Sequence, residues 1–223
     1  MAKKESYVVI GLGKFGMTIC SALAQAGQEV LAIDSNPDVV NEVSHLVVRA
    51  VIANAEEEET LKELAVGNFD HVYISIGHNI EASIMATLIV KELGAPDVTC
   101  RAENIHHARV LERVGADTVV RPEHDIAERL VFRKLNPNVV DFVRISENLM
   151  LAEVTIRNPK FFNRSLGELE IRRRFNVNVI AILDHQDQLN EMPMATDTIH
   201  DHDKLTVIGS QAAIEQLSDE VDR

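Results

Sequence analysis

The first 135 residues repeat one pattern, in which a short apolar run rich in β-branched residues precedes a turn and then a stretch with helical periodicity. Strands that alternate with helices in this way are typical of a parallel sheet with helices on its faces. The pattern predicts strands at 7–10, 29–34, 49–52, 71–76, 97–101 and 118–120. It predicts helices at 15–26, 37–43, 57–64, 80–93, 105–114 and 123–135. Six strands of this kind indicate an α/β Rossmann-type sheet.

The pattern changes at Asn136, Pro137 and Asn138, because proline cannot continue a helix and asparagine favours a turn. Beyond this point the pattern predicts a mixture of strands and helices. The strands are expected at 139–145, 151–157, 177–183 and 205–208, and the helices at 166–175 and 211–221. We therefore expect a Rossmann domain over 1–135 and a small α+β lobe over 139–223, which is too short for the substrate domain of most dehydrogenases.

Charge and cysteine content restrict the partners and the compartment. The chain has 35 acidic and 22 basic residues and a formal net charge of −13, so we expect neither nucleic acid nor a bare bilayer as its partner. Cys20 and Cys100, the two cysteines, each lie in an apolar stretch, which argues against a disulfide framework. Neither a signal peptide nor an apolar run of about 18 residues is recognisable. These features predict a cytoplasmic protein.

A glycine-rich loop follows the first predicted strand and opens the first predicted helix. In this loop Gly11 suits a tight turn, Gly13 lets the backbone approach a pyrophosphate, and Gly16 lets helix and strand pack closely. Asp34 ends the second strand, where a carboxylate accepts hydrogen bonds from the ribose hydroxyls and repels a 2′-phosphate. The alternative is that the glycines serve only the turn and that Asp34 only caps the helix beginning near Pro37.

Two more strand ends, at 53–55 and 75–77, are expected to meet this loop. Asn54 has groups for a base or ribose, but it is equally suited to capping the helix near Glu56. Lys14 and Arg101 are candidate phosphate cations. The predicted nucleotide-binding residues are Gly11, Gly13, Lys14, Phe15, Gly16, Asp34, Ser35, Asn54, Ala55, Ile76, Gly77, Asn79, Arg101 and Glu123.

Glu123 is a carboxylate in the same predicted site as the phosphates. Such a position is costly unless a divalent cation lies between the two anions, so Glu123 indicates a Mg2+ or Ca2+ ion at a terminal phosphate. The alternative is an ordinary acidic residue in the first turn of a helix. The histidines at 106–107 and 200–202 lack a third ligand at suitable spacing, so we interpret them as surface residues.

Four segments together resemble a known family. They are YVVIGLGKFGMTIC at 7–20, ANA at 53–55, SIGHNIEAS at 75–83 and GADTVVRPE at 115–123. They resemble the RCK regulatory subunits of bacterial Ktr and Trk potassium uptake systems, in the KtrA branch, and nearly the whole chain is covered. Lys14 departs from the arginine that is usual at this position in the branch, and lysine lacks its bidentate geometry.

The resemblance implies a gating subunit without catalytic activity. Dimers would assemble into an octameric ring on the cytoplasmic face of a membrane-embedded potassium-translocating subunit. ATP would favour an active ring and ADP an inactive one. Glu123 matches the position linked to a cation at the γ-phosphate.

In relatives from Gram-positive bacteria, the second lobe binds cyclic di-AMP across a dimer interface. The resemblance implies that site at Ile171, Arg172, Asn178, Ile180 and Pro193, although the segment 184–194 departs from the family pattern.

The alternative function is a small NAD-dependent oxidoreductase or a sensor of NAD and NADH, which the glycine loop alone supports equally well. The residues do not identify a histidine or lysine as the acid for hydride transfer.

Overall fold

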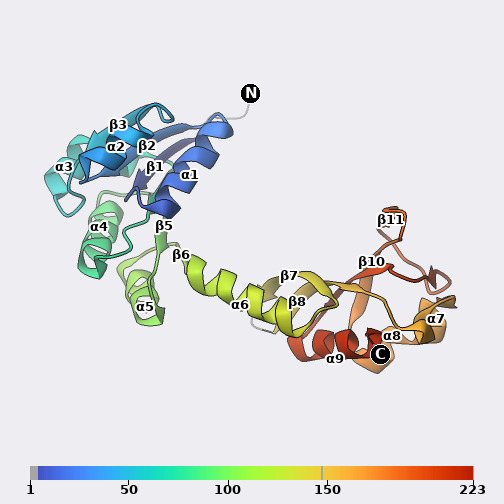
Figure 1. Cartoon of the computed structure of the whole chain (residues 1–223). Helices are drawn as coiled ribbons and strands as arrows, with labels where there is room; N and C mark the ends of the chain where they lie inside the picture. The colour runs from blue at the N-terminus through green and yellow to red at the C-terminus, as the bar shows by residue number, and fades with distance from the viewer. Residues whose placement is uncertain (1–4, 147, 223) are drawn as a thin grey trace. The chain divides into compact units, whose positions relative to one another are not determined.

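A computed structural model describes residues 5–146 and 148–222. The chain divides into two compact units between Glu123 and His124, and each unit has its own apolar core (Figure 1). Over the described residues, no helix is both long and apolar enough to cross a membrane.

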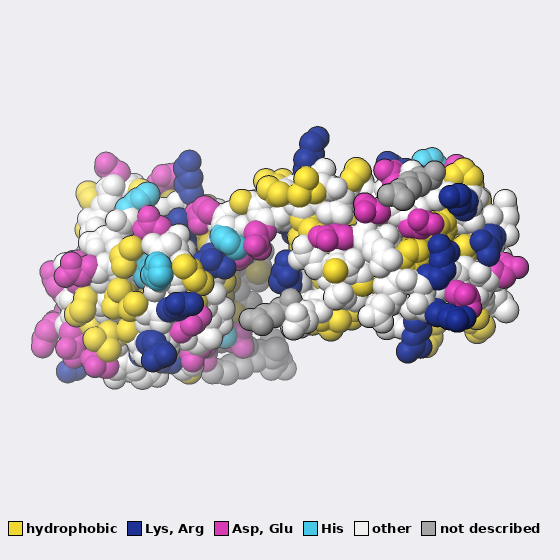
Figure 2. Space-filling model, turned by 90° about the horizontal axis from the view of Figure 1, so that it is seen from below, with side chains coloured by type: hydrophobic (Ala, Val, Ile, Leu, Met, Phe, Trp, Pro, Cys, Tyr) yellow, Lys and Arg dark blue, Asp and Glu magenta, His cyan; other side chains and the backbone are white. Residues whose placement is uncertain are grey.

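Charged side chains of both signs lie on the face of the molecule drawn in Figure 2. Aspartate and glutamate side chains occur there on both units, together with lysine and arginine side chains. On this face the acidic residues are therefore not confined to one unit.

The first unit is built on a sheet of six parallel strands in the order β3-β2-β1-β4-β5-β6. The strands are β1 (Ser6–Ile10), β2 (Glu29–Asp34), β3 (Arg49–Ile52), β4 (His71–Ile74), β5 (Val98–Arg101) and β6 (Thr118–Val120). Its helices are α1 (Lys14–Gln25), α2 (Pro37–Val43), α3 (Glu58–Glu63), the 3-10 turn η1 (Val66–Asn68), α4 (Ile80–Glu92) and α5 (Ile105–Val114). The order reverses between β1 and β4, which is where Rossmann sheets bind ligands. The predicted Rossmann-type sheet is confirmed.

Alternate residues of the strands face two separate apolar clusters. Val9 lies in a cluster with residues of α1 and α2, including Cys20, whereas Val8 and Ile10 lie in a cluster with residues of α3, α4 and α5. Cys100 belongs to the second cluster, and both thiols are free and buried. Helices therefore cover both faces of the sheet, as the near-continuous apolar strands require.

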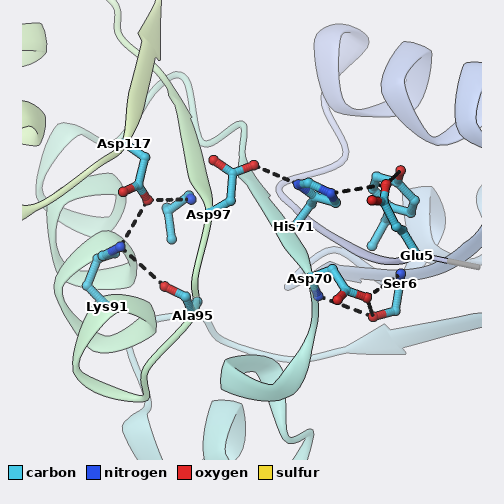
Figure 3. Close-up of polar contacts among 10 residues, drawn as sticks. Glu5, Ser6, Asp70, His71, Lys91, Ala95, Asp97 and Asp117 are labelled. Atoms are coloured by element: carbon cyan, nitrogen blue, oxygen red, sulfur yellow. Dashed lines mark hydrogen bonds and ion pairs between the residues drawn. The ribbon is translucent and has the colours of Figure 1, made fainter. Parts of the chain in front are cut away.

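Polar side chains connect neighbouring strands at the N-terminal edge of this sheet (Figure 3). His71 contacts Asp97 through Nδ1 at 2.7 Å and Glu5 through Nε2 at 3.3 Å. The ring of Tyr7 stacks on His71 at 5.0 Å between centroids, and its hydroxyl donates to Glu5. This contact set joins β1, β4 and β5 at the edge opposite their carboxyl ends.

The second unit contains a five-stranded antiparallel sheet in the order β11-β10-β13-β8-β7 and a two-stranded sheet of β12 and β9. Helix α9 supplies Ile214, Leu217 and Val221 to the core of this unit. The elements are α6 (Pro122–Leu135), β7 (Val139–Ser146), β8 (Leu149–Thr155), η2 (Pro159–Phe161), β9 (Arg164–Ser165), α7 (Leu166–Leu169), α8 (Ile171–Phe175), β10 (Asn178–Leu183), β11 (Leu189–Asn190), β12 (Thr198–Ile199), β13 (Lys204–Gly209) and α9 (Gln211–Val221). The predicted small α+β lobe is confirmed.

The division between the units differs from the boundary predicted after residue 135. Helix α6 begins at Pro122, but its later turns pack with the second unit. Phe132 is 8% exposed and meets Phe142 edge to face at 4.6 Å, and the Arg129 guanidinium Nε donates to Asp141 at 2.9 Å. Residues 124–135 therefore lie in the second compact unit, because their side chains contact the strand that follows, β7.

Most predicted elements differ from the observed ones by one or two residues at an end, and two differ in a way that matters for the architecture. The predicted strand 71–76 ends at Ile74, so that residues 75–77 form a loop. The predicted helix 166–175 is divided at Glu170, whose φ of 47° is left-handed, into α7 and α8. The short strands β9, β11 and β12 were not predicted, because two residues carry too little pattern to identify a strand.

Candidate functional site

A pocket of about 760 Å³ lies at the carboxyl ends of the six parallel strands. The loops that follow β1, β2, β3 and β4 line it, together with Arg101 at the end of β5 and Glu123 in the first turn of α6. Every predicted nucleotide-binding residue except Gly16 lines this pocket: Gly11, Gly13, Lys14, Phe15, Asp34, Ser35, Asn54, Ala55, Ile76, Gly77, Asn79, Arg101 and Glu123. One concave site therefore collects side chains that are distant in the sequence.

The glycine loop brings the start of α1 to the pocket. Gly11 has a φ of +88°, and a Cβ at Gly16 would lie 2.0 Å from the Gly11 carbonyl oxygen, so both positions require glycine. A Cβ at Gly13, the N-cap of α1, would meet no atom within 4 Å. The first turn of a helix carries free N–H groups and the positive end of its dipole, which together favour an anion.

Asp34 holds the glycine loop and its own loop together. Its Oδ2 accepts from the Leu12 N–H at 2.6 Å, and its Oδ1 accepts from the Asn36 N–H at 2.8 Å. Asn36 caps α2 by accepting from the Asp38 N–H at 2.9 Å, so the capping role considered for Asp34 belongs to Asn36. Each carboxylate oxygen has a second lone pair, which leaves acceptors for ribose hydroxyls.

Two asparagines at the pocket also shape the backbone. Asn54 Oδ1 accepts from the Glu56 N–H at 3.1 Å, ahead of the N-cap of α3 at Glu57. Asn79 is the N-cap of α4 and accepts from the Ala82 N–H at 3.0 Å. Asn54 therefore shapes the turn before α3 without being its cap as considered, and its position in the pocket lining leaves the ligand role open.

An ion pair joins Arg101 and Glu123 across the pocket. Arg101 Nη2 donates to Glu123 Oε1 at 2.6 Å, and this hydrogen bond holds the pKa of Glu123 below its ordinary value. The Arg101 side chain is 17% exposed and that of Glu123 is 67% exposed. The charge of Glu123 is therefore paired with a cation of the chain itself.

A metal site formed by the protein alone is not found in the described part of the chain. Within it, no group of three or more histidine, cysteine, aspartate or glutamate residues is arranged to hold an ion. His107, expected at the surface, is 3% exposed, and burial lowers the pKa of its imidazole. Its Nδ1 accepts from the Glu103 N–H at 3.2 Å, so this histidine has a role in local packing.

Four further residues with polar side chains at the pocket were not predicted as binding residues. Ser75 is 5% exposed, and its hydroxyl makes no hydrogen bond to another described residue. The signal for Ser75 and His78 was their place in the loop after β4, next to predicted residues. The four are Asn36, Glu56, Ser75 and His78.

The residues matched to a cyclic di-AMP site differ in exposure. Ile171 is 2% exposed and belongs to the core of the second unit, so it offers no free apolar wall. Arg172 and Asn178 are exposed, and Ile180, also on β10, is 41% exposed. Pro193 is half-buried in the loop after β11.

Comparisons with known proteins decide the family. The TrkA-N domain matches residues 7–122, and the TrkA-C domain matches residues 151–222. The chain belongs to the TrkA-N/TrkA-C family of RCK proteins. This RCK chain is 41% identical over 218 residues to the Ktr system potassium uptake protein C of Bacillus subtilis, covering 98% of each protein. It is 35% identical to the Ktr system potassium uptake protein A of the same organism, covering 98% of this chain and 97% of the relative.

Solved structures of other proteins share the fold of this chain. The GsuK channel bound to NAD matches 97% of this RCK chain with a TM-score of 0.64 and 18% identity. The chain spans 40% of that channel's length. Ktr and Trk RCK proteins are regulatory subunits and not catalysts, which agrees with the expectation that this chain is not an enzyme.

Proposed function

We propose that this chain is the nucleotide-sensing regulatory subunit of a potassium uptake system. The observation that carries the proposal is the pocket at the switch point, where the N-terminus of α1, Asp34 and Arg101 line one cavity. The likeness to Ktr potassium uptake proteins over 98% of the chain supports potassium as the ion that the system transports. The partner is a membrane-embedded subunit that translocates potassium, and the chain acts on its cytoplasmic face.

The proposed ligands are ATP and ADP. Lys14 and Arg101 are the cations in the pocket lining, and they suit a chain of phosphates, while Asp34 suits an unmodified ribose. ATP favours the active conformation and ADP the inactive one, which requires that each nucleotide bind the two conformations with different affinity. NAD and NADH are the second candidates, and the GsuK channel bound to NAD supports them.

The proposed cation is Mg2+ or Ca2+ beside the terminal phosphate, with Glu123 as the protein ligand. Mg2+ is commonly held by one or two carboxylates together with nucleotide phosphates, so a single glutamate is compatible with this role. When bound, the ion would supply positive charge to the phosphates. We expect Glu123→Gln to remove the Mg2+-dependent part of ATP affinity.

Two finer parts of the proposal concern assembly and a second ligand. The chains form dimers that assemble into an octameric ring. Cyclic di-AMP binds the second unit through Arg172, Asn178, Ile180 and Pro193, with Ile171 behind them in the core. Absence of calorimetric heat with cyclic di-AMP would exclude this second ligand.

Calorimetry on the full chain tests the proposed ligand. We expect ATP and ADP to bind, with NAD and NADH weaker. Adenosine 2′,5′-diphosphate, which places a phosphate at Asp34, should bind on the order of tenfold more weakly than adenosine 5′-monophosphate because like charges repel. Tight binding of NADH with weak binding of ATP would instead favour the oxidoreductase or NAD(H) sensor.

A further inference from the structure

The contact between Arg101 and Glu123 uses only part of what the guanidinium offers. Nε and Nη2 lie on one edge of a planar guanidinium and donate in parallel, which suits two oxygens of one anion. Arg101 Nη2 donates a hydrogen bond to Glu123 Oε1 at 2.6 Å, whereas Nε of the same arginine is buried and has no acceptor among the described residues. The edge therefore carries a donor that a carboxylate in this position leaves unused.

The guanidinium of Arg101 lies against the backbone of Gly77. A Cβ at Gly77 would stand 1.9 Å from Arg101 Nη1, so the end of the Arg101 side chain occupies the space that a larger residue at this position would need. Gly77 and Arg101 line the same pocket as Gly13 and Lys14 at the start of α1. A side chain at residue 77 would therefore move the guanidinium from its place in the pocket.

We propose that the Glu123 carboxylate pairs with Arg101 while the pocket holds no nucleotide. A nucleotide phosphate then displaces this carboxylate and binds the Nε and Nη2 edge of the guanidinium. This inference rests on the proposed nucleotide binding in the same pocket. A phosphate group has the oxygens to accept from both donors, and the Glu123 side chain, which is 67% exposed, is free to turn away from Arg101 when it is displaced. Gly77 is the positioning residue for this exchange.

The place of Glu123 in the chain gives the exchange a consequence. It is the last residue of the first unit and lies in the first turn of α6, whose later turns belong to the second unit. Displacement by a phosphate releases a contact at the residue where the chain leaves the nucleotide-binding unit. The number of phosphates on the ligand can therefore change the contacts at the start of α6.

Calorimetry in the presence of EDTA tests the exchange apart from any cation. ATP and adenosine are titrated into the wild-type chain, Glu123→Gln and the control Asp125→Asn, which removes a nearby charge on α6 without contact to Arg101. We expect Glu123→Gln to bind ATP on the order of tenfold more tightly, because the competing anion is gone. Adenosine affinity should stay unchanged, and Asp125→Asn should match the wild type.

Gly77→Ala provides a second measurement, because its Cβ displaces the guanidinium. ATP affinity should fall towards that of adenosine, and adding Glu123→Gln to Gly77→Ala should restore none of it. Unchanged or weaker ATP binding by Glu123→Gln in EDTA overturns the inference, and equal tightening in Asp125→Asn overturns it as well. If ATP binds neither the wild type nor any variant, the proposed nucleotide binding is itself wrong.

Discussion

Gly13 and Gly16 belong to one loop but have different surroundings. The position of a Cβ at Gly16 is filled by the carbonyl oxygen of Gly11, whereas the position at Gly13 is open. One glycine therefore allows the helix to approach the strand, and the other keeps space free beside the first turn of α1. The same sequence motif thus serves packing at one residue and access at the other.

This difference predicts opposite results for two alanine substitutions. Gly16→Ala should destabilise the first unit by about 1–3 kcal/mol, the usual cost of a side chain forced into a packed site. Gly13→Ala should change stability by less than about 1 kcal/mol and should weaken nucleotide binding. Urea unfolding and calorimetry measure the two effects. Equal loss of stability in both variants would contradict this account.

Residue roles were predictable from the sequence where they depend on the local backbone. Gly11, Gly13 and Gly16 lie within six residues, and their fingerprint is legible without the fold. Gly77 is different, because its glycine requirement comes from Arg101 on another strand. The Arg101 contact of Glu123 likewise depends on the end of β5 meeting the start of α6, so it could not be predicted from the sequence.

At the scale of elements, His71 joins strands at the edge of the sheet opposite the pocket. Glu5, Asp97, Tyr7 and the neighbouring Asp70 surround it, and Asp70 accepts from the N–H and hydroxyl of Ser6. The hydrogen bond to Asp97 is the main cause that raises the pKa of His71, against the opposing effect of burial. Protonated His71 therefore bridges two carboxylates and stabilises this edge.

The raised pKa fixes the direction of the pH dependence. Stabilisation by His71 is fully present below the pKa of about 6.5 that a histidine has in the unfolded chain, and it is lost as pH rises through the higher folded-state pKa. We expect His71→Gln to lower stability by about 0.5–1 kcal/mol at pH 6 and by less at pH 9. Thermal unfolding followed by circular dichroism measures this.

His78→Gln is the control for this prediction, because His78 is exposed at the pocket and distant from that edge of the sheet. A loss of stability in His71→Gln that is the same at both pH values would contradict the proposed bridge.

Elements with a strong periodic pattern were predictable, and those set by tertiary contacts were not. The helices 37–43, 105–114 and 211–221 have the predicted limits. The break at Glu170 could not be read from the apolar pattern on either side of it, because nothing in that pattern marks a left-handed residue. The pairing of β9 with β12 joins segments more than 30 residues apart, which local periodicity does not record.

At the scale of the molecule, α6 presents exposed apolar side chains. Ile126, Leu130, Val131 and Leu135 are 54%, 62%, 58% and 74% exposed. Several such residues on one helix are typical of a surface that associates with another chain. They offer an apolar surface for association with another chain, which the proposed octameric ring requires.

Light scattering after size exclusion tests this assembly. We expect the mass of eight copies of the 24.8 kDa chain, and a smaller species for Leu130→Asp with Val131→Asp, because charges are costly in an apolar interface. Arg133→Glu, an exposed change on the same helix, serves as the matched control. A monomer in the wild type would contradict the ring.

The two buried thiols lie on opposite sides of the parallel sheet, one in each apolar cluster. Burial raises the pKa of Cys20 and of Cys100 to about 11, so neither is a nucleophile in the closed protein. A thiol reagent can react only after the helices on that side have opened. The labelling rate of Cys20 therefore reports how often the helices on one face of the sheet open, and that of Cys100 reports the same for the other face.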